Sequence, residues 1–138
     1  MTGDKRFDEW NRVKQSLHRL AKLPRISEGD VYWCGFGENV GVEINGKNSA
    51  FSRPVVVLRK LSQYSFLGVP LTSQKHIGTW YVNFDFLHKK EYAVLSQVRV
   101  LSVSRLYDKI GHLSANDLFK IRKGFDNLYC LQKICPQP

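Results

Sequence analysis

The sequence has little of what a secreted, disulfide-stabilised or membrane-spanning protein needs. Its three cysteines, Cys34, Cys130 and Cys135, form no Cys-x-x-Cys pair and have no histidine at zinc-ligand spacing, so neither a disulfide framework nor a metal site is expected. No apolar run approaches the roughly 18 residues of a membrane span, and the charged N-terminus is unlike a signal peptide. A glycine-rich phosphate loop is also missing. These absences predict a cytoplasmic protein with reduced thiols, no membrane association, no metal and no cofactor.

Acidic residues are scarce. Twelve Asp and Glu stand against 21 Lys and Arg, which gives the 138-residue chain a formal charge of +9. Such an excess attracts polyanions, and an acidic protein partner would satisfy the same electrostatics. Charge alone does not separate these partners from a role in solubility.

The N-terminal part reads as an amphipathic helix followed by a linker. Apolar residues recur every three or four positions from Phe7 to Leu20, which is the spacing of one helical face. Pro24 ends the pattern, because the residue before a proline is pushed out of the helical region. We therefore divide the chain into an N-terminal helix with its linker, residues 1–28, and a main domain, residues 29–138.

The main domain reads as short strands. Those expected are Val31–Trp33, Pro54–Leu58, Tyr64–Leu71, Thr79–Phe86, Tyr92–Leu95 and Val98–Val103, with a long polar loop from Gly35 to Ala50. A second helix begins at Ser114, a residue suited to capping it, and continues to Leu131. The fold class is therefore mainly β with flanking helices, a small, bent antiparallel sheet or SH3-like barrel.

Two short segments carry candidate chemistry. Arg53 lies between the long loop and the most apolar strand, where its planar guanidinium can hold a phosphate in a bidentate fork. Thr72, Ser73 and Gln74 follow the next strand and offer hydrogen bonds to a phosphate. Taken alone, Arg53 is better explained as a surface arginine, and the segment from Thr72 to Gln74 as an ordinary turn at a strand end.

Other features are less specific. The loop Gly37–Asn48 displays polar groups, among them Glu43, in a way that suits single-stranded RNA. The aromatic residues Tyr32, Trp33, Trp80 and Tyr81 can stack on bases if one sheet face is open. The histidines are scattered, and the carboxylates Asp85 and Glu91 are isolated in the sequence, so a two-histidine or two-carboxylate acid–base site is not favoured.

The order of these segments resembles the MazF/PemK toxin family. The matching motifs are GDVYW at 29–33, GVE at 41–43, RPVVVL at 53–58, VPLTSQ at 69–74, LSQVRVL at 95–101 and SRLYDKIGHLS at 104–114. Two features differ from the family pattern: the loop is lengthened over 44–52, and the N-terminal helix is extra. That helix is expected to cover the barrel, to extend a dimer interface or to alter antitoxin docking.

The resemblance implies a plasmid-maintenance-toxin barrel, a homodimer and control by an acidic antitoxin protein. It also implies metal-independent, sequence-selective cleavage of single-stranded RNA, in which the ribose 2′-hydroxyl attacks the adjacent phosphate. Arg53 and Thr72 occupy the positions of the family's catalytic pair. The positions implied for substrate binding are Val42, Glu43, Ser73, Gln74 and Gln97. The alternative is a non-catalytic barrel that binds nucleic acid or gyrase, or a structural domain of SH3 type.

Overall fold

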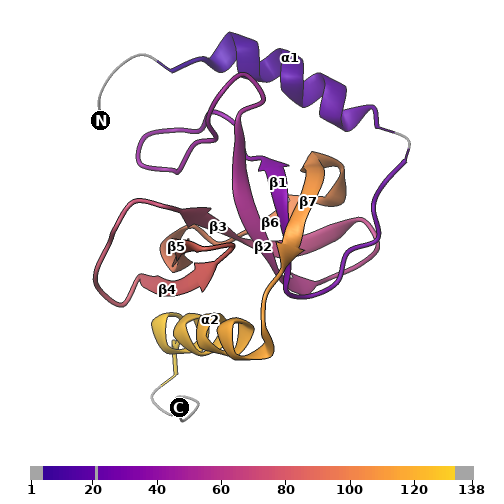
Figure 1. Cartoon of the computed structure of the whole chain (residues 1–138). Coiled ribbons are helices and arrows are strands. Elements are labelled where there is room, and N and C mark those ends of the chain that lie inside the picture. The colour runs from indigo at the N-terminus through magenta and orange to yellow at the C-terminus, as the bar shows by residue number, and fades with distance from the viewer. Residues whose placement is uncertain (1–4, 21, 133–138) are drawn as a thin grey trace.

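The computed structural model describes residues 5–20 and 22–132 and shows a bent antiparallel sheet with a helix at either end of the molecule (Figure 1). The elements in chain order are α1 (Phe7–His18), β1 (Asp30–Gly35), β2 (Ser52–Lys60), β3 (Ser65–Thr72), β4 (Tyr81–Phe86), β5 (Lys89–Val94), the 3₁₀ turn η1 (Leu95–Gln97), β6 (Arg99–Ser102), the 3₁₀ turn η2 (Val103–Arg105), β7 (Leu106–His112) and α2 (Ala115–Leu128). The prediction of a mainly β fold with a helix at each end is confirmed.

The strands pair in the order β4-β5-β3-β2-β1-β7, and β6 also pairs with β3. Strand β3 is shared because its two ends have different partners. Its first half pairs with β6, starting at Ser65 opposite Ser102, and its last two residues pair with β5. A register shift between Val57 and Arg59 bends β2 against β3. The sheet is therefore strongly bent, but the hydrogen-bonded path from β4 to β7 is not closed.

Alternating side chains of β2 supply two separate hydrophobic clusters. Val56 and Leu58 belong to a cluster that includes Leu118 of α2, whereas Val55 and Val57 belong to a cluster on the other face. This is the period-two alternation of a strand that is buried on both faces. Helix α2 begins at its predicted cap, where the Ser114 hydroxyl accepts a hydrogen bond from the Asp117 backbone N–H at 3.1 Å.

Helix α1 covers the loop between β1 and β2, residues 36–51, which we call the 36–51 loop. Trp10 and Leu17 are buried and form a third cluster with Phe51. The Trp10 and Phe51 rings have their centroids 5.6 Å apart. The structure therefore shows α1 covering this loop, and the roles in a dimer interface or in antitoxin docking stay predictions.

Three sequence-based expectations differ from the structure. Strand β7 was missed, because its residues Asp108, Lys109 and Gly111 hide the alternation of a strand that pairs only with β1. Strand β5 begins at Lys89 rather than at Tyr92. The expectation that all thiols are reduced was wrong for Cys130, which is disulfide-bonded, whereas Cys34 is a buried free thiol.

Within residues 5–20 and 22–132, no helix has the length and apolar character needed to cross a membrane. Ile26 of the predicted linker is buried in the same cluster as Tyr32 of β1. The boundary between residues 28 and 29 stays a prediction.

Candidate active site

Arg53 is the second residue of β2, and its guanidinium is held beneath the surface. The side chain is 9% exposed. Its Nε donates to the Asn45 carbonyl oxygen at 2.8 Å, and its Nη1 donates to the Leu71 carbonyl oxygen at 3.1 Å. Burial lowers the pKa of Arg53, but a guanidinium titrates so far above neutrality that the charge persists. Other N–H groups of the same guanidinium remain available to an anion.

Thr72, the last residue of β3, lies in the same cavity as Arg53. The β2–β3 register ends with Val55 opposite Pro70, two residues short of Arg53 and of Thr72, and Arg53 reaches across to the carbonyl oxygen of Leu71, the neighbour of Thr72. Thr72 Oγ1 accepts a hydrogen bond from the Gln74 backbone N–H at 3.2 Å. Since that bond uses only a lone pair, the hydroxyl proton is free to be donated to a ligand.

These two side chains open into one cavity of about 150 Å³, which we call the Arg53 pocket. Its lining residues are Trp33, Lys47, Asn48, Ser52, Arg53, Pro54, Leu71, Thr72, Ser73, Lys89 and Glu91. Three of them are cations and one is an acid, so the pocket suits an anion such as a phosphodiester. The pocket thus contains both predicted catalytic residues and Ser73.

Glu91 is the one acid of this pocket, and the sequence analysis set it aside as an isolated carboxylate. It lies on β5 next to Tyr92, the residue that pairs with Thr72. Its side chain is 9% exposed, and burial raises the pKa of its carboxyl, against the opposing effect of Lys89. Because β5 was predicted to start at Tyr92, Glu91 fell outside every expected strand. Correct placement of β5 would have found it.

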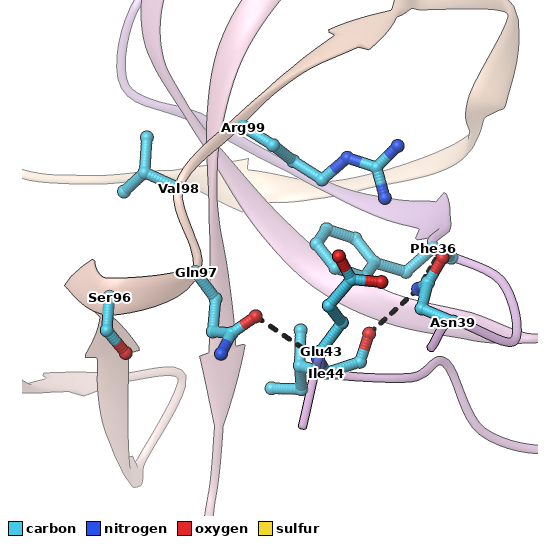
Figure 2. A pocket seen from close by; sticks show the side chains of 8 residues that line it. All are labelled: Phe36, Asn39, Glu43, Ile44, Ser96, Gln97, Val98 and Arg99. Atoms are coloured by element: carbon cyan, nitrogen blue, oxygen red, sulfur yellow. Dashed lines mark hydrogen bonds between the residues drawn. The ribbon is translucent and has the colours of Figure 1, made fainter. Parts of the chain in front are cut away.

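A second, larger cavity of about 430 Å³ lies between the 36–51 loop and η1 (Figure 2), and we call it the Gln97 pocket. Its lining residues are Phe36, Asn39, Glu43, Ile44, Ser96, Gln97, Val98 and Arg99. Gln97 Oε1 accepts a hydrogen bond from the Ile44 backbone N–H at 3.1 Å, and the Arg99 guanidinium lies 5.4 Å from the Phe36 ring centroid. Glu43 and Gln97, distant in sequence, therefore line one cavity.

The other predicted binding residues lie on the surface. Val42 is 85% exposed on the 36–51 loop. Gln74 is exposed, and its backbone N–H holds the Thr72 hydroxyl. Of the four aromatic residues, Tyr32 is buried, Trp33 is exposed beside the Arg53 pocket, and Tyr81 stacks on His76 with a centroid distance of 4.4 Å. Tyr32 therefore has no free face for a base.

Comparison with protein families supplies the observation that decides the relationship. Residues 27–129 match the model of the PemK-like, MazF-like toxins of type II toxin–antitoxin systems. The chain belongs to this family. The match confirms the resemblance noted in the sequence, and it begins after α1, so the helix that covers the 36–51 loop precedes the part of the chain shared with the family.

Solved structures of MazF-like toxins share the fold. The structure is similar to MazF from Deinococcus radiodurans, with 21% identity and a TM-score of 0.62 over 80% of this chain and 99% of that one. It is also similar to an endoribonuclease in complex with its cognate antitoxin from a mycobacterial species, with 19% identity and a TM-score of 0.58 over 83% of this chain and 99% of that one. The Mycobacterium tuberculosis toxin MazF-mt6 matches at 15% identity and a TM-score of 0.56, over 75% and 98% of the two chains. No curated protein matches the chain.

Proposed function

We propose that this protein is the toxin of a type II toxin–antitoxin system and that it cleaves single-stranded RNA as a metal-independent endoribonuclease. One observation carries the proposal: a buried arginine and a threonine line the same cationic pocket of a PemK/MazF family member. Similar solved structures are described as endoribonucleases. A protein that only binds RNA has no need to bury a guanidinium beside a hydroxyl at the end of two strands.

The arrangement suits attack of a ribose 2′-hydroxyl on the adjacent phosphorus. In this reaction the O2′–P bond forms, the P–O5′ bond breaks, and negative charge grows on the non-bridging oxygens. Arg53 would neutralise that charge, because a preorganised donor stabilises negative charge as it develops in the transition state. Thr72 would donate its hydroxyl proton to one of the same oxygens, and Ser73 lies beside it.

The Gln97 pocket would hold a base of the bound RNA. Amide and carboxylate side chains such as Gln97 and Glu43 can hydrogen-bond the edges of an unstacked base, and Arg99 can stack on its face. Val42 is exposed on the 36–51 loop, and Gln74 is exposed just after β3. Both would contact the flanking nucleotides. This division assigns phosphate chemistry to one pocket and base selection to the other.

The remaining partners follow from charge and family. A chain of +9 complements a flexible acidic antitoxin, and a similar endoribonuclease has been solved with its cognate antitoxin. We expect a cytoplasmic homodimer. Sedimentation of the protein as a monomer at micromolar concentration would contradict the dimer.

The test is cleavage of a long single-stranded RNA in EDTA, with mapping of the cut ends. Wild-type protein should give discrete cuts ending in 2′,3′-cyclic phosphate. Arg53→Ala should lose roughly 10²–10³-fold in rate, the usual effect of deleting a donor to a developing oxyanion, and Thr72→Ala should also be impaired. Arg59→Ala removes an exposed arginine from the same strand and should cleave normally.

Two results would count against the proposal. If wild-type protein binds the RNA but leaves it intact, the non-catalytic binding barrel becomes the better account. If Arg53→Ala cleaves as fast as Arg59→Ala, the reaction is carried out elsewhere on the protein or by a contaminant.

A further inference from the structure

The proposed reaction needs a group that removes the 2′-hydroxyl proton, and Arg53 and Thr72 are unsuited to it. A guanidinium is already protonated at neutral pH, and a neutral hydroxyl is a very weak base. The Arg53 pocket has no histidine among its lining residues, and its lysines Lys47 and Lys89 are cations. Only one lining residue is able to accept a proton near neutral pH, and it is Glu91.

The surroundings of Glu91 differ from those of a structural carboxylate. Its side chain is more than nine-tenths buried, yet it opens into the pocket. Among the described residues, none forms a salt bridge or a hydrogen bond with its carboxylate. By contrast, buried Asp30 is bonded to His112, Lys109 and the Ser27 N–H. Since no polar side-chain atom of the described residues is both buried and unpartnered, the Glu91 carboxylate oxygens are accessible from the pocket, where a substrate could reach them.

The strand register explains how Glu91 is held. On one side of β5 it pairs with Phe84 of β4, a buried aromatic residue. Its chain neighbour Tyr92 pairs with Thr72 of β3. The Glu91 backbone is therefore fixed by β4, and its position relative to Thr72 is set by the sheet through Tyr92 rather than by a loop. Such rigid support suits a group that must meet a reacting atom.

We propose that Glu91 is the general base of the RNA cleavage reaction, an inference that rests on the proposed function. The ionised carboxylate takes the proton from O2′ as the O2′–P bond forms. Arg53 and Thr72 stabilise the charge on the non-bridging oxygens, the P–O5′ bond breaks, and the 5′ oxygen takes a proton from water. The protonated Glu91 then returns its proton to solvent, so that the protein ends the cycle unchanged.

The charges around Glu91 predict how the cleavage rate depends on pH. Lys89 on its own strand, Lys47 from the 36–51 loop and Arg53 from β2 are the charged groups that share the pocket with it, whereas its β4 neighbour Phe84 carries no charge. Burial raises the pKa of Glu91 above the ordinary value of 4.5, and Lys89 acts in the opposite sense. Since the ionised form is the active one, the cleavage rate should rise with pH through this raised pKa and then level off.

The experiment compares wild type, Glu91→Gln, Glu91→Asp and Asp85→Asn by single-turnover cleavage, in EDTA, of a short RNA carrying the cut site mapped for wild type. Asp85 lies on the same hairpin, is 79% exposed in its side chain and pairs with Lys90 outside the pocket. Glu91→Gln should lose about 10²-fold or more in rate, the usual share of a general base, while binding the RNA as tightly as before. In Glu91→Gln the rise of the cleavage rate with pH should disappear. Glu91→Asp should keep this pH dependence at a reduced rate, and Asp85→Asn should match wild type.

A substrate with sulfur in place of the 5′ oxygen separates base from acid. Sulfur leaves without a proton, so this RNA relieves loss of a general acid but not loss of a base. Glu91→Gln should therefore stay slow on it. Full recovery would assign Glu91 to the leaving group and overturn the proposal.

The outcomes also separate the two proposals. If wild type does not cut RNA, the proposed function fails. A different result would overturn only the inference about Glu91: wild type cuts RNA, Arg53→Ala does not, and Glu91→Gln keeps the wild-type rate and its dependence on pH. An equal loss of RNA affinity and rate in Glu91→Gln would show a binding role and would also overturn it.

Discussion

Trp10→Ala should release helix α1 and, with it, the 36–51 loop. Trp10 is 6% exposed, and its ring packs against Phe51 and lies 5.7 Å from the Arg105 guanidinium. It also fills the space beside Gly37, where an added Cβ would come within 2.5 Å of the indole. Truncation therefore removes the largest side chain of the third cluster together with a cation–π contact.

The expected cost is that of deleting a buried aromatic residue, about 3–5 kcal/mol. This corresponds to a shift of roughly 10²–10⁴-fold in the equilibrium between docked and released α1. Once released, a helix of 12 residues is marginal in water. The loss should therefore be local, because the two clusters built on β2 do not include Trp10.

Hydrogen exchange measured on peptides is the direct assay. In Trp10→Ala, the amides of α1 and the 36–51 loop should lose about 10²-fold or more in protection, whereas those of β2 and β3 should keep theirs. Phe119→Ala, which truncates an aromatic residue that is 62% exposed on α2, should change stability by less than about 0.5 kcal/mol. Unchanged protection in the loop would refute the reasoning, and so would an equal loss across β2 and β3.

Two further predictions concern stability and pH. Because the folded-state pKa of Glu91 is raised, its ionised form opposes folding, and Glu91→Gln should melt at a higher temperature than wild type at pH 7, with the difference vanishing below about pH 4.5; a lower melting temperature at pH 7 would contradict this. For Asp30, burial acts to raise the pKa, but hydrogen bonds from His112, the Ser27 N–H and Lys109 outweigh it and lower the pKa. Its contribution is therefore present above pH 3.8 and lost as pH falls, so Asp30→Asn should cost about 1.5–3 kcal/mol at pH 7 in chemical denaturation and much less near pH 3. An equal cost at both pH values would show that the charge is irrelevant.

Much of the fold could be predicted from local pattern alone. Strand β2 was found because PVVVL is a continuous apolar run, and α2 because Ser114 caps a helical repeat. Strand β7 was not predicted, because it contains charged residues and a glycine and forms a strand only through its pairing with β1. Its most consequential contact, between His112 and Asp30, spans 82 positions, which no local pattern can reveal.

The candidate site shows the same division. Arg53 and Thr72 were identified by their motifs, but only the resemblance to the family linked one to the other. In the structure they meet in one cavity because β2 and β3 are neighbouring strands. Glu91 was set aside as an isolated carboxylate, because its neighbours in the pocket come from β2, β3 and the 36–51 loop. A carboxylate's use depends on what surrounds it, and here the surroundings other than Lys89 are distant in sequence.

The attachment of α1 to the 36–51 loop has a consequence for the entropy of substrate recognition. Lys5 donates to the carbonyl oxygens of Asn39 and Gly41, and Arg6 bonds to Glu38 and to Asn48. Ordering a loop residue costs about 1–2 kcal/mol in backbone entropy. Because the hydrogen bonds of Lys5 and Arg6 already hold the loop, this entropy is lost when the protein folds and not when a ligand binds. The loop that lines the Gln97 pocket is therefore preorganised for binding.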